Sequence, residues 1–331
     1  MNGQLPKKIN YLRVSVTDRC NLRCIYCMPK EGLSLLGHND ILRYEEILRV
    51  VRAAIPEGIT KVRLTGGEPL ARKGLVGFIA RLAGLKGLMD VSLTTNGTLL
   101  ADHAEEIYRA GVRRINISLD SLNPERYRAI TRGGDLEAVL RGIRKAAAVG
   151  FFPIKINVVL MKGTNDDEIL DFAQATLRWP YQVRFIEMMS IGQNNSEAIT
   201  EYLSNDVALE RIGRMFKLEY LGENGAPENR GPARRYRIEG AKGEIGFISP
   251  ISHEFCGDCN RLRLTAEGHL RACLLSDDEI DLKHDLRSGC SDRVLKALIR
   301  KAIASKPAAK NMLPGDPSPK KCSRQMSTIG G

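Results

Sequence analysis

Apolar and polar positions follow two different periods along the first two thirds of the chain. Short segments with a period of two alternate with longer segments whose apolar residues recur every three or four positions, a pattern typical of successive βα units. We predict six units up to about residue 215. The predicted strands are 11–16, 61–65, 91–95, 115–119, 154–160 and 183–187. The predicted helices are 44–54, 74–83, 100–109, 136–149, 166–178 and 205–215, the fifth capped by Asp166 or Asp167.

One face of the predicted strands is polar. Strands covered by helices on both faces read as nearly unbroken apolar runs. Here polar side chains occupy alternate positions: Arg13 and Ser15, Arg63 and Thr65, Asn116 and Ser118, and Lys155 and Asn157. Burying such charges under helices in a doubly wound sheet would cost several kcal/mol per unpaired ion. We therefore predict an α/β fold built as an incomplete (β/α)6 TIM-like barrel, with a wet, basic interior that holds something polar and negatively charged.

The βα pattern ends after residue 215. Residues 222–235 are rich in Gly, Pro and Asn and indicate a loop or linker. Possible hairpin strands at 235–240 and 244–250 follow, and then a helical segment at 291–305. The last two dozen residues are rich in Lys, Pro and Gly and favour a mobile tail. We predict a barrel domain over 5–230 and a smaller C-terminal domain over 231–331.

Composition and charge narrow the class of partner. The 331 residues include 50 Lys and Arg against 39 Asp and Glu, a net charge of +11, which suits an anionic partner. The chain has no basic stripe interleaved with aromatic residues, so a small polyanion is favoured over nucleic acid. No apolar stretch is long enough to cross a bilayer, and residues 1–10 have no apolar leader core. We therefore expect a cytoplasmic protein that binds neither membranes nor nucleic acid.

Six of the eight cysteines form two distant trios. The first trio is Cys20, Cys24 and Cys27, and the second is Cys256, Cys259 and Cys273. Three thiolates in a short loop are typical ligands of an iron–sulfur cluster, and a missing fourth ligand leaves one metal open. Spacing alone leaves zinc open, above all at the second trio, and His38, His253 or His269 could be the fourth ligand of a zinc ion. Disulfides are disfavoured in a reducing cytosol, and Cys290 and Cys322 stand apart.

Polar and glycine residues follow several predicted strands at their carboxyl ends. These positions are Gly66-Gly67-Glu68-Pro69, Thr94-Thr95-Asn96-Gly97 and Ser118-Leu119-Asp120, and the first cysteine trio follows the first strand. Functional residues of βα barrels gather at this end. Each motif alone is typical of an ordinary turn, but their shared position predicts one site at the top of the barrel.

Several motifs together resemble a known family. The C-x3-C-x2-C run with Tyr26 before its last cysteine, followed by GGEP, resembles the signature of radical S-adenosylmethionine enzymes. The segments LRVSVTDRCNLRCIYCMP, TGGEP, RFIEMM, FCGDCNRLRLT and the terminal IGG are similar to the GTP 3′,8-cyclase family within that superfamily, which acts in molybdenum cofactor biosynthesis. The resemblance extends from about residue 10 to the C-terminus.

The resemblance implies two clusters and a cofactor. Cys20, Cys24 and Cys27 would hold a [4Fe-4S] cluster that binds S-adenosylmethionine, and Cys256, Cys259 and Cys273 would hold a second [4Fe-4S] cluster whose open iron meets the purine of GTP. The residues implied to bind S-adenosylmethionine are Tyr26, Gly67, Ser118 and Met189. The residues implied to bind GTP are Arg13, Arg63, Thr94, Lys155, Arg261 and Arg263, with Lys61 and Arg184 as weaker matches. Gly330 and Gly331 match a tail that enters the active site and assists catalysis.

The implied reaction joins C3′ of the ribose to C8 of guanine and gives 3′,8-cyclo-7,8-dihydro-GTP. The resemblance also implies a homodimer, an electron donor, and cyclic pyranopterin monophosphate synthase as the next enzyme. Two alternatives stay open at this point. A radical enzyme that modifies peptides would carry more C-terminal cysteines, and a zinc-stabilised basic protein that binds nucleic acid would leave GGEP and the polar strand face unexplained.

Overall fold

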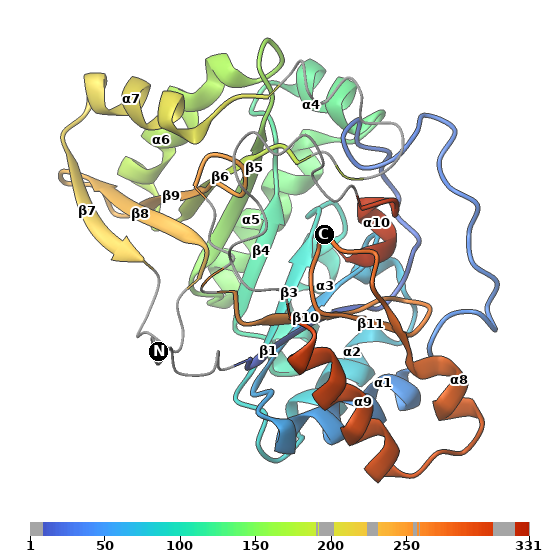
Figure 1. The fold of residues 1–331 in the computed structure, drawn as a ribbon. Coiled ribbons are helices and arrows are strands. Elements are labelled where there is room, and N and C mark those ends of the chain that lie inside the picture. Colours follow the sequence, from blue (N-terminus) through green and yellow to red (C-terminus); the bar gives the residue numbers. More distant parts are fainter. Residues whose placement is uncertain are drawn as a thin grey trace, which may run out of the picture.

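A single open β-sheet organises the chain. The computed structural model describes residues 9–189, 191, 202–223, 231–253, 257, 259–306 and 322–330. In these residues twelve strands are hydrogen-bonded in the order β12-β11-β10-β1-β2-β3-β4-β5-β6-β9-β8-β7. The central strands are β1 (Tyr11–Ser15), β2 (Lys61–Thr65), β3 (Asp90–Thr95), β4 (Arg114–Ser118), β5 (Ile154–Leu160) and β6 (Gln182–Glu187), all parallel. The sheet curves around a hollow and does not close (Figure 1), so the prediction of an incomplete (β/α)6 barrel is confirmed.

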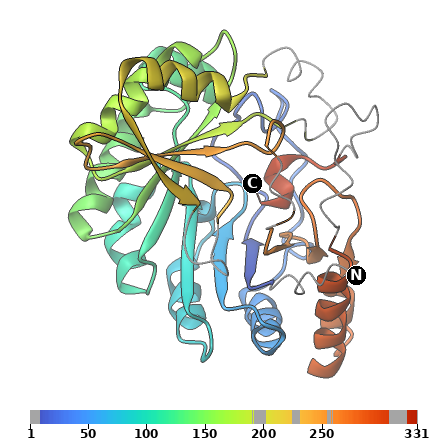
Figure 2. The ribbon, with the colours of Figure 1, turned by 60° about the vertical axis from the view of Figure 1, so that its left-hand side comes forward.

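Helices cover the outer face of the curved sheet (Figure 2). They are α1 (Tyr44–Ala54), α2 (Leu75–Ala83), α3 (Leu100–Arg109), α4 (Pro124–Thr131), α5 (Leu136–Val149), α6 (Ile169–Arg178) and α7 (Asn205–Met215). The apolar strand positions, such as Leu12, Val62 and Ile115, point outward against these helices and are at most 1% exposed. The amphipathic period of the helices therefore matches the period of two of the strands, and the polar strand positions face inward.

C-terminal strands extend the sheet at both edges. At one edge β9 (Glu244–Ile248) pairs parallel with β6, and β8 (Ala233–Ile238) and β7 (Leu218–Glu223) continue antiparallel. At the other edge β10 (Arg261–Leu264) pairs parallel with β1, followed by β11 (His269–Arg271) and β12 (Ile280–Asp281). Helices α8 (Leu282–Arg287) and α9 (Asp292–Ala304) come next, and α9 packs beside α1 (Figure 1).

Three local predictions need correction. Neither Asp166 nor Asp167 caps the fifth helix: Asp166–Glu168 form a 3-10 turn, α6 starts at Ile169, and the Asp166 carboxylate pairs with Arg211 at 3.1 Å. The segment 222–235 is not only a loop, because β7 ends at Glu223 and β8 starts at Ala233. The prediction of a mobile tail is wrong for residues 322–330, which include the short helix α10 (Met326–Ile329) and a buried Ile329, and the rest of the predicted tail lies outside the described residues. The described part of the chain contains no helix with the length and apolarity that a bilayer crossing requires.

Candidate active site

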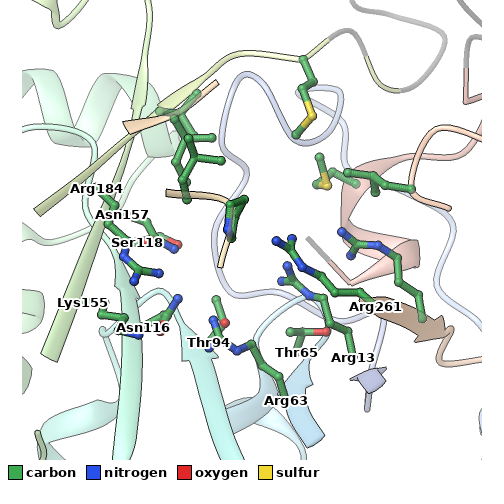
Figure 3. Close-up of a pocket in the computed structure, with 18 of the residues that line it drawn as sticks. Arg13, Arg63, Thr65, Thr94, Asn116, Ser118, Lys155, Asn157, Arg184 and Arg261 are labelled. Carbon is green, nitrogen blue, oxygen red and sulfur yellow. The ribbon is translucent and has the colours of Figure 1, made fainter. Parts of the chain in front are cut away.

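One cavity of about 910 Å³ fills the hollow of the barrel. It extends from the amino ends of the strands, at Lys61 and Asp90, to their carboxyl ends, at Thr95 and Glu187. Figure 3 shows side chains of β1 and β10 facing Lys155 and Arg184 across this space. The cavity therefore receives side chains from strands that are far apart in the sequence.

The structure brings the predicted site residues together. The predicted residues that line the cavity are Cys20, Cys24, Tyr26, Cys27, Gly67, Ser118, Met189, Arg13, Lys61, Arg63, Thr94, Lys155, Arg184, Cys259, Arg261, Arg263 and Cys273. Both cysteine groups thus open on the same chamber. Gly330 is buried beside it, and its carbonyl accepts a hydrogen bond of 2.6 Å from Arg263 Nη1. The other two predicted residues, Cys256 and Gly331, lie outside the described residues.

The first cysteine trio lies on a tightly held loop. The backbone N–H groups of Cys27 and Met28 donate to the carbonyl of Cys24, which forms a turn. The Sγ atom of Cys20 accepts from the N–H of Leu22 at 3.4 Å. Burial, followed by the neighbouring thiols Cys27 and Cys20 and the carboxyl of Asp120, raises the pKa of Cys24 well above its ordinary value. Three thiols with this mutual coupling have the donor set of an iron–sulfur site, so the residues fit such a cluster.

Tyr26 fastens the cysteine loop to the barrel. Its hydroxyl donates to Asp120 Oδ2 at 2.7 Å, and Asp120 Oδ1 accepts from the N–H of Val159 at 2.8 Å. Burial raises the pKa of Asp120 to about 6, although the hydrogen bond from Tyr26 acts in the opposite direction and lowers it. The aromatic residue predicted to bind cofactor therefore also ties the loop to the ends of β4 and β5.

The two glycines of GGEP allow another close approach. A Cβ atom on Gly67 would lie 2.2 Å from the carbonyl oxygen of Arg19, and Gly66 has φ of 149°. The next residue, Glu68, is fully buried and accepts hydrogen bonds from Thr95 Oγ1 (2.8 Å) and the N–H of Asn96 (2.7 Å). The motif therefore joins β2, β3 and the cysteine loop. The close backbone contact at Gly67 requires glycine, and the sequence alone does not reveal this structural requirement.

Gly67→Ala is expected to destabilise the protein and to displace the cysteine loop. The added methyl group meets backbone atoms, which cannot rotate away, and overpacking of this kind costs about 1–3 kcal/mol. Thermal unfolding and the iron content after anaerobic reconstitution measure the two effects. The matched control is Gly77→Ala on the exposed side of α2, where a Cβ meets nothing within 4 Å and stability should hold or rise. Equal stability of both variants would contradict the packing role of Gly67.

Parallel pairing aligns cations in rows on the inner face. Register places Arg13 between Arg63 of β2 and Arg263 of β10. Burial, together with Arg263 and Arg63, lowers the pKa of Arg13 well below its ordinary value. Across the cavity, burial and the adjacent Arg184 and Arg63 lower the pKa of Lys155 to about 5. Positive charges crowded in this way are stabilised by an anion between them.

Neutral polar atoms in the same cavity also lack partners. Thr94 Oγ1, Asn116 Oδ1 and Asn157 Oδ1 are buried and have no hydrogen-bond partner among the described residues. All three side chains line the cavity. Buried polar groups in folded proteins are nearly always satisfied, so these atoms indicate a polar ligand.

Cys259 and Cys273, the described members of the second trio and here called the second cysteine group, have a cationic neighbour that the sequence did not reveal. Lys306 lines the cavity, and its ammonium group lies near the thiol of Cys259 and attracts the thiolate form. Burial raises the pKa of Cys259, but Arg261 and Lys306 together lower it to about 7. Cys259 and Cys273 therefore face cations and the open cavity, which suits thiolate ligands of a cluster. Lys306 lies beyond a helix, in a segment whose composition gave no sign of this position.

An ionic cluster holds the C-terminal segment against the barrel. Arg324 pairs with Glu267 and with Glu279, the second at 2.7 Å. The fully buried Arg271 pairs with the same Glu279 and donates to Cys322 Sγ at 3.3 Å. This docking places Gly330 next to the cavity and holds residues 322–330 against the barrel.

Within the described residues, no three His, Cys, Asp or Glu side chains are placed to hold one metal ion together. The seven described cysteines form no disulfide.

Two family descriptions together match most of the chain. Residues 14–176 match the Radical SAM superfamily, and residues 181–312 match Molybdenum Cofactor Synthesis C. A radical S-adenosylmethionine enzyme is thus the class that the barrel and the cysteine loop define. Curated relatives are named GTP 3′,8-cyclase: the protein of Heliobacterium modesticaldum is 51% identical and that of Moorella thermoacetica 48% identical, each over 100% of both chains. The chain belongs to the GTP 3′,8-cyclase family.

Solved structures show the same architecture at low sequence identity. Streptococcus suis SuiB bound to S-adenosylmethionine superposes with a TM-score of 0.61 and 13% identity, over 96% of this chain and 77% of that chain. Another crystal structure of SuiB gives a TM-score of 0.56 over 83% of this chain and 63% of that chain. At this identity the likeness shows the fold alone.

Proposed function

We propose that this chain converts GTP to 3′,8-cyclo-7,8-dihydro-GTP with S-adenosylmethionine, the radical step that begins molybdenum cofactor biosynthesis. The observation that carries the proposal is the shared chamber: Cys20, Cys24 and Cys27 open on the same cavity as Cys259 and Cys273, with a row of cations between them. Curated relatives of this name, alike over their whole length, support the reaction.

The roles of the residues follow from their positions. A [4Fe-4S] cluster on Cys20, Cys24 and Cys27 would supply the electron that cleaves S-adenosylmethionine and so gives the hydrogen-abstracting radical. Ser118, at the carboxyl end of β4, offers a hydroxyl to the cofactor from the cavity wall. Met189 lines the cavity and packs against the small apolar cluster of Ile191, Cys322 and Ile329, so it joins the cofactor side of the chamber to the cluster that holds the docked tail.

The inner face of the strands binds the substrate. Arginine forks grip phosphate oxygens with two hydrogen bonds, and lysine adds a point charge. Arg13, Arg63 and Lys155 lie on different strands and point into the chamber (Figure 3), so they can hold several phosphates at once. Fixing the ribose within contact of the radical source is the main kinetic contribution of the protein, because a displaced radical would react elsewhere.

GTP binding is expected to take up a proton at Lys155. With a pKa of about 5 in the free protein, this ammonium group is mostly neutral at pH 7, and a nearby triphosphate raises its pKa. Between the two pKa values the complex holds one more proton than the free protein, so affinity falls by up to about tenfold per pH unit as pH rises. Calorimetry at pH 7 in buffers of different ionisation enthalpy should show the uptake.

Lys155→Met should lose this proton uptake and bind GTP more weakly. The exposed Lys162, just after β5, provides the matched control Lys162→Met, which should keep the wild-type uptake. Proton uptake that is the same in Lys155→Met and in the wild type would contradict the assignment of the titrating group.

An anaerobic assay tests the proposed function. The reconstituted full chain is mixed with GTP, S-adenosylmethionine and a chemical reductant, and mass spectrometry follows the nucleotide and 5′-deoxyadenosine. The proposal predicts cyclised GTP and 5′-deoxyadenosine in equal amounts, since each abstraction consumes one radical. Cleavage of S-adenosylmethionine without any cyclised nucleotide from fully loaded protein would refute it.

The proposed reaction also implies an electron donor, a next enzyme and a cytoplasmic location. Cleavage of a sulfonium consumes an electron, so we infer an external donor, and the product would pass to cyclic pyranopterin monophosphate synthase. A reducing cytoplasm suits thiols that hold clusters. The homodimer and the division into 5–230 and 231–331 stay predictions, which sedimentation and separate expression of the two parts would test.

A further inference from the structure

Lys306 lies where two segments of the second cysteine group meet. Its Nζ atom donates to the carbonyl of Arg261 at 2.5 Å and to the carbonyl of Ala272 at 2.8 Å. Arg261 is the first residue of β10 and follows Cys259 by two positions, whereas Ala272 directly precedes Cys273. One ammonium group thus joins the backbone on both sides of the group.

The same ammonium group lies near the thiol of Cys259 and attracts its thiolate form. A lysine ammonium has three N–H donors, and two of them are used on the backbone beside the cysteines. The side chain is half-buried at the wall of the cavity, where desolvation of a charge is costly unless hydrogen bonds compensate it. Such an arrangement is expected of a cation with a fixed position and not of a solvated surface lysine.

A role in ending the helix does not explain these contacts. The backbone N–H of Lys306 donates to the carbonyl of Ile303, which continues the last turn after α9, but its side chain bonds to β10 and to the strand end that precedes Cys273. Helix α9 is itself fixed to the barrel by ion pairs at its two ends, Arg49 with Asp292 and Glu57 with Arg300. The helix therefore delivers Lys306 to the cysteine group from a rigid base.

We propose that Lys306 is a positioning residue for the second iron–sulfur site, which aligns the segments of Cys259 and Cys273 and supplies positive charge to their thiolates. The inference rests on the proposed function only in taking these thiols as cluster ligands. A cluster bound by thiolates carries negative charge, and its reduction potential responds to hydrogen bonds and charges at the sulfur atoms. Loss of the ammonium removes both the alignment and the charge.

The test compares Lys306→Met, Lys306→Arg and the control Lys301→Met after anaerobic reconstitution of the full chain with iron and sulfide. Lys301 is exposed on α9, so its variant reports any general effect on this helix. Iron per chain and a spectroscopic redox titration are the measurements. The wild type and Lys301→Met should hold about eight irons, two cubane clusters, and Lys306→Met about four. Lys306→Arg, which keeps the charge and can donate to both carbonyls, should recover most of the lost iron.

Each result for Lys306→Met either supports or contradicts the positioning role of Lys306. Half-loading of Lys306→Met, or full loading with a lowered potential of the second cluster, supports it when the uncoupled cleavage of S-adenosylmethionine persists. Wild-type iron with an unchanged potential overturns it, and so does the loss of both sets of irons, because Lys306 would then hold the fold and not the site. If the wild type holds eight irons but makes no cyclised nucleotide, the proposed function is contradicted. The role of Lys306 is then still tested by the iron content of its variants.

Discussion

Cys20→Ser is expected to reduce the cleavage of S-adenosylmethionine to background and the iron content from about eight to about four per chain. The loop itself should stay folded in this variant. Arg23 Nη1 donates to the carbonyl of Cys20 at 2.6 Å, and the N–H of Ile25 donates to the carbonyl of Ile130, and neither bond uses the thiol. The loss should therefore be chemical: a serine hydroxyl is a poor substitute for a thiolate that holds iron.

Iron analysis, visible absorption and detection of 5′-deoxyadenosine measure the effect. The matched control is Cys290→Ser, because Cys290 is also partly buried but does not line the cavity. That variant should keep both clusters and full activity. If Cys20→Ser still cleaved S-adenosylmethionine at the wild-type rate, the first trio could not be the cluster site.

The barrel could be predicted because its signals are local. Strands β2 and β5 and helices α1, α3, α5 and α7 have the predicted bounds, since each period is carried by contiguous residues. The polar parity of the strands also predicted the charged interior. It did so because side chains alternate across a strand, so Arg63 and Thr65 must share a face.

Features that depend on distant pairing were missed. Nothing in the short segment Arg261–Leu264 indicates that it pairs parallel with β1 and so places Arg263 beside Arg13. Helix α4 was also missed, because its eight residues carry a weak apolar pattern between two turns, although Asn123 caps it clearly. Such elements are specified by the surface they complete rather than by their own period.

The residues of the site also divide into those with a local sequence signal and those that depend on distant partners. Cys24 could be singled out from its spacing in the first trio, and Gly67 from its place at the end of a strand and from the family resemblance. Lys306 and Arg324 instead act through partners 30 or more residues away. No local sequence signal predicted that residues 322–330 dock on the barrel, since the docking comes from ion pairs of Arg324 with Glu267 and Glu279. A composition rich in Lys and Pro favours disorder only where no such partners exist.

Arg263→Ala is expected to lower kcat/KM for GTP cyclisation by about 30-fold to 3,000-fold while cleavage of S-adenosylmethionine continues. In the proposed complex Arg263 forms a charge pair with GTP. Truncating one partner of a buried, hydrogen-bonded charge pair costs about 2–5 kcal/mol, and each 1.4 kcal/mol is about tenfold. Arg263 is 5% exposed, and burial, then Arg261, lowers its pKa to about 10, so it stays protonated at pH 7. Its loss removes a cation from the row with Arg13 and the donor to the Gly330 carbonyl.

Mass spectrometry should therefore find 5′-deoxyadenosine in excess over cyclised nucleotide, whereas the wild type forms them equally. Arg263→Lys keeps the charge but not the planar fork, so it should recover only part of the activity. Arg109→Ala removes an exposed arginine of α3 that pairs with Glu105 and does not line the cavity, so it should leave both products unchanged. Because the first cysteine loop makes no hydrogen bond to Arg263 among the described contacts, equal loss of both products would show that this arginine supports the fold instead of the substrate.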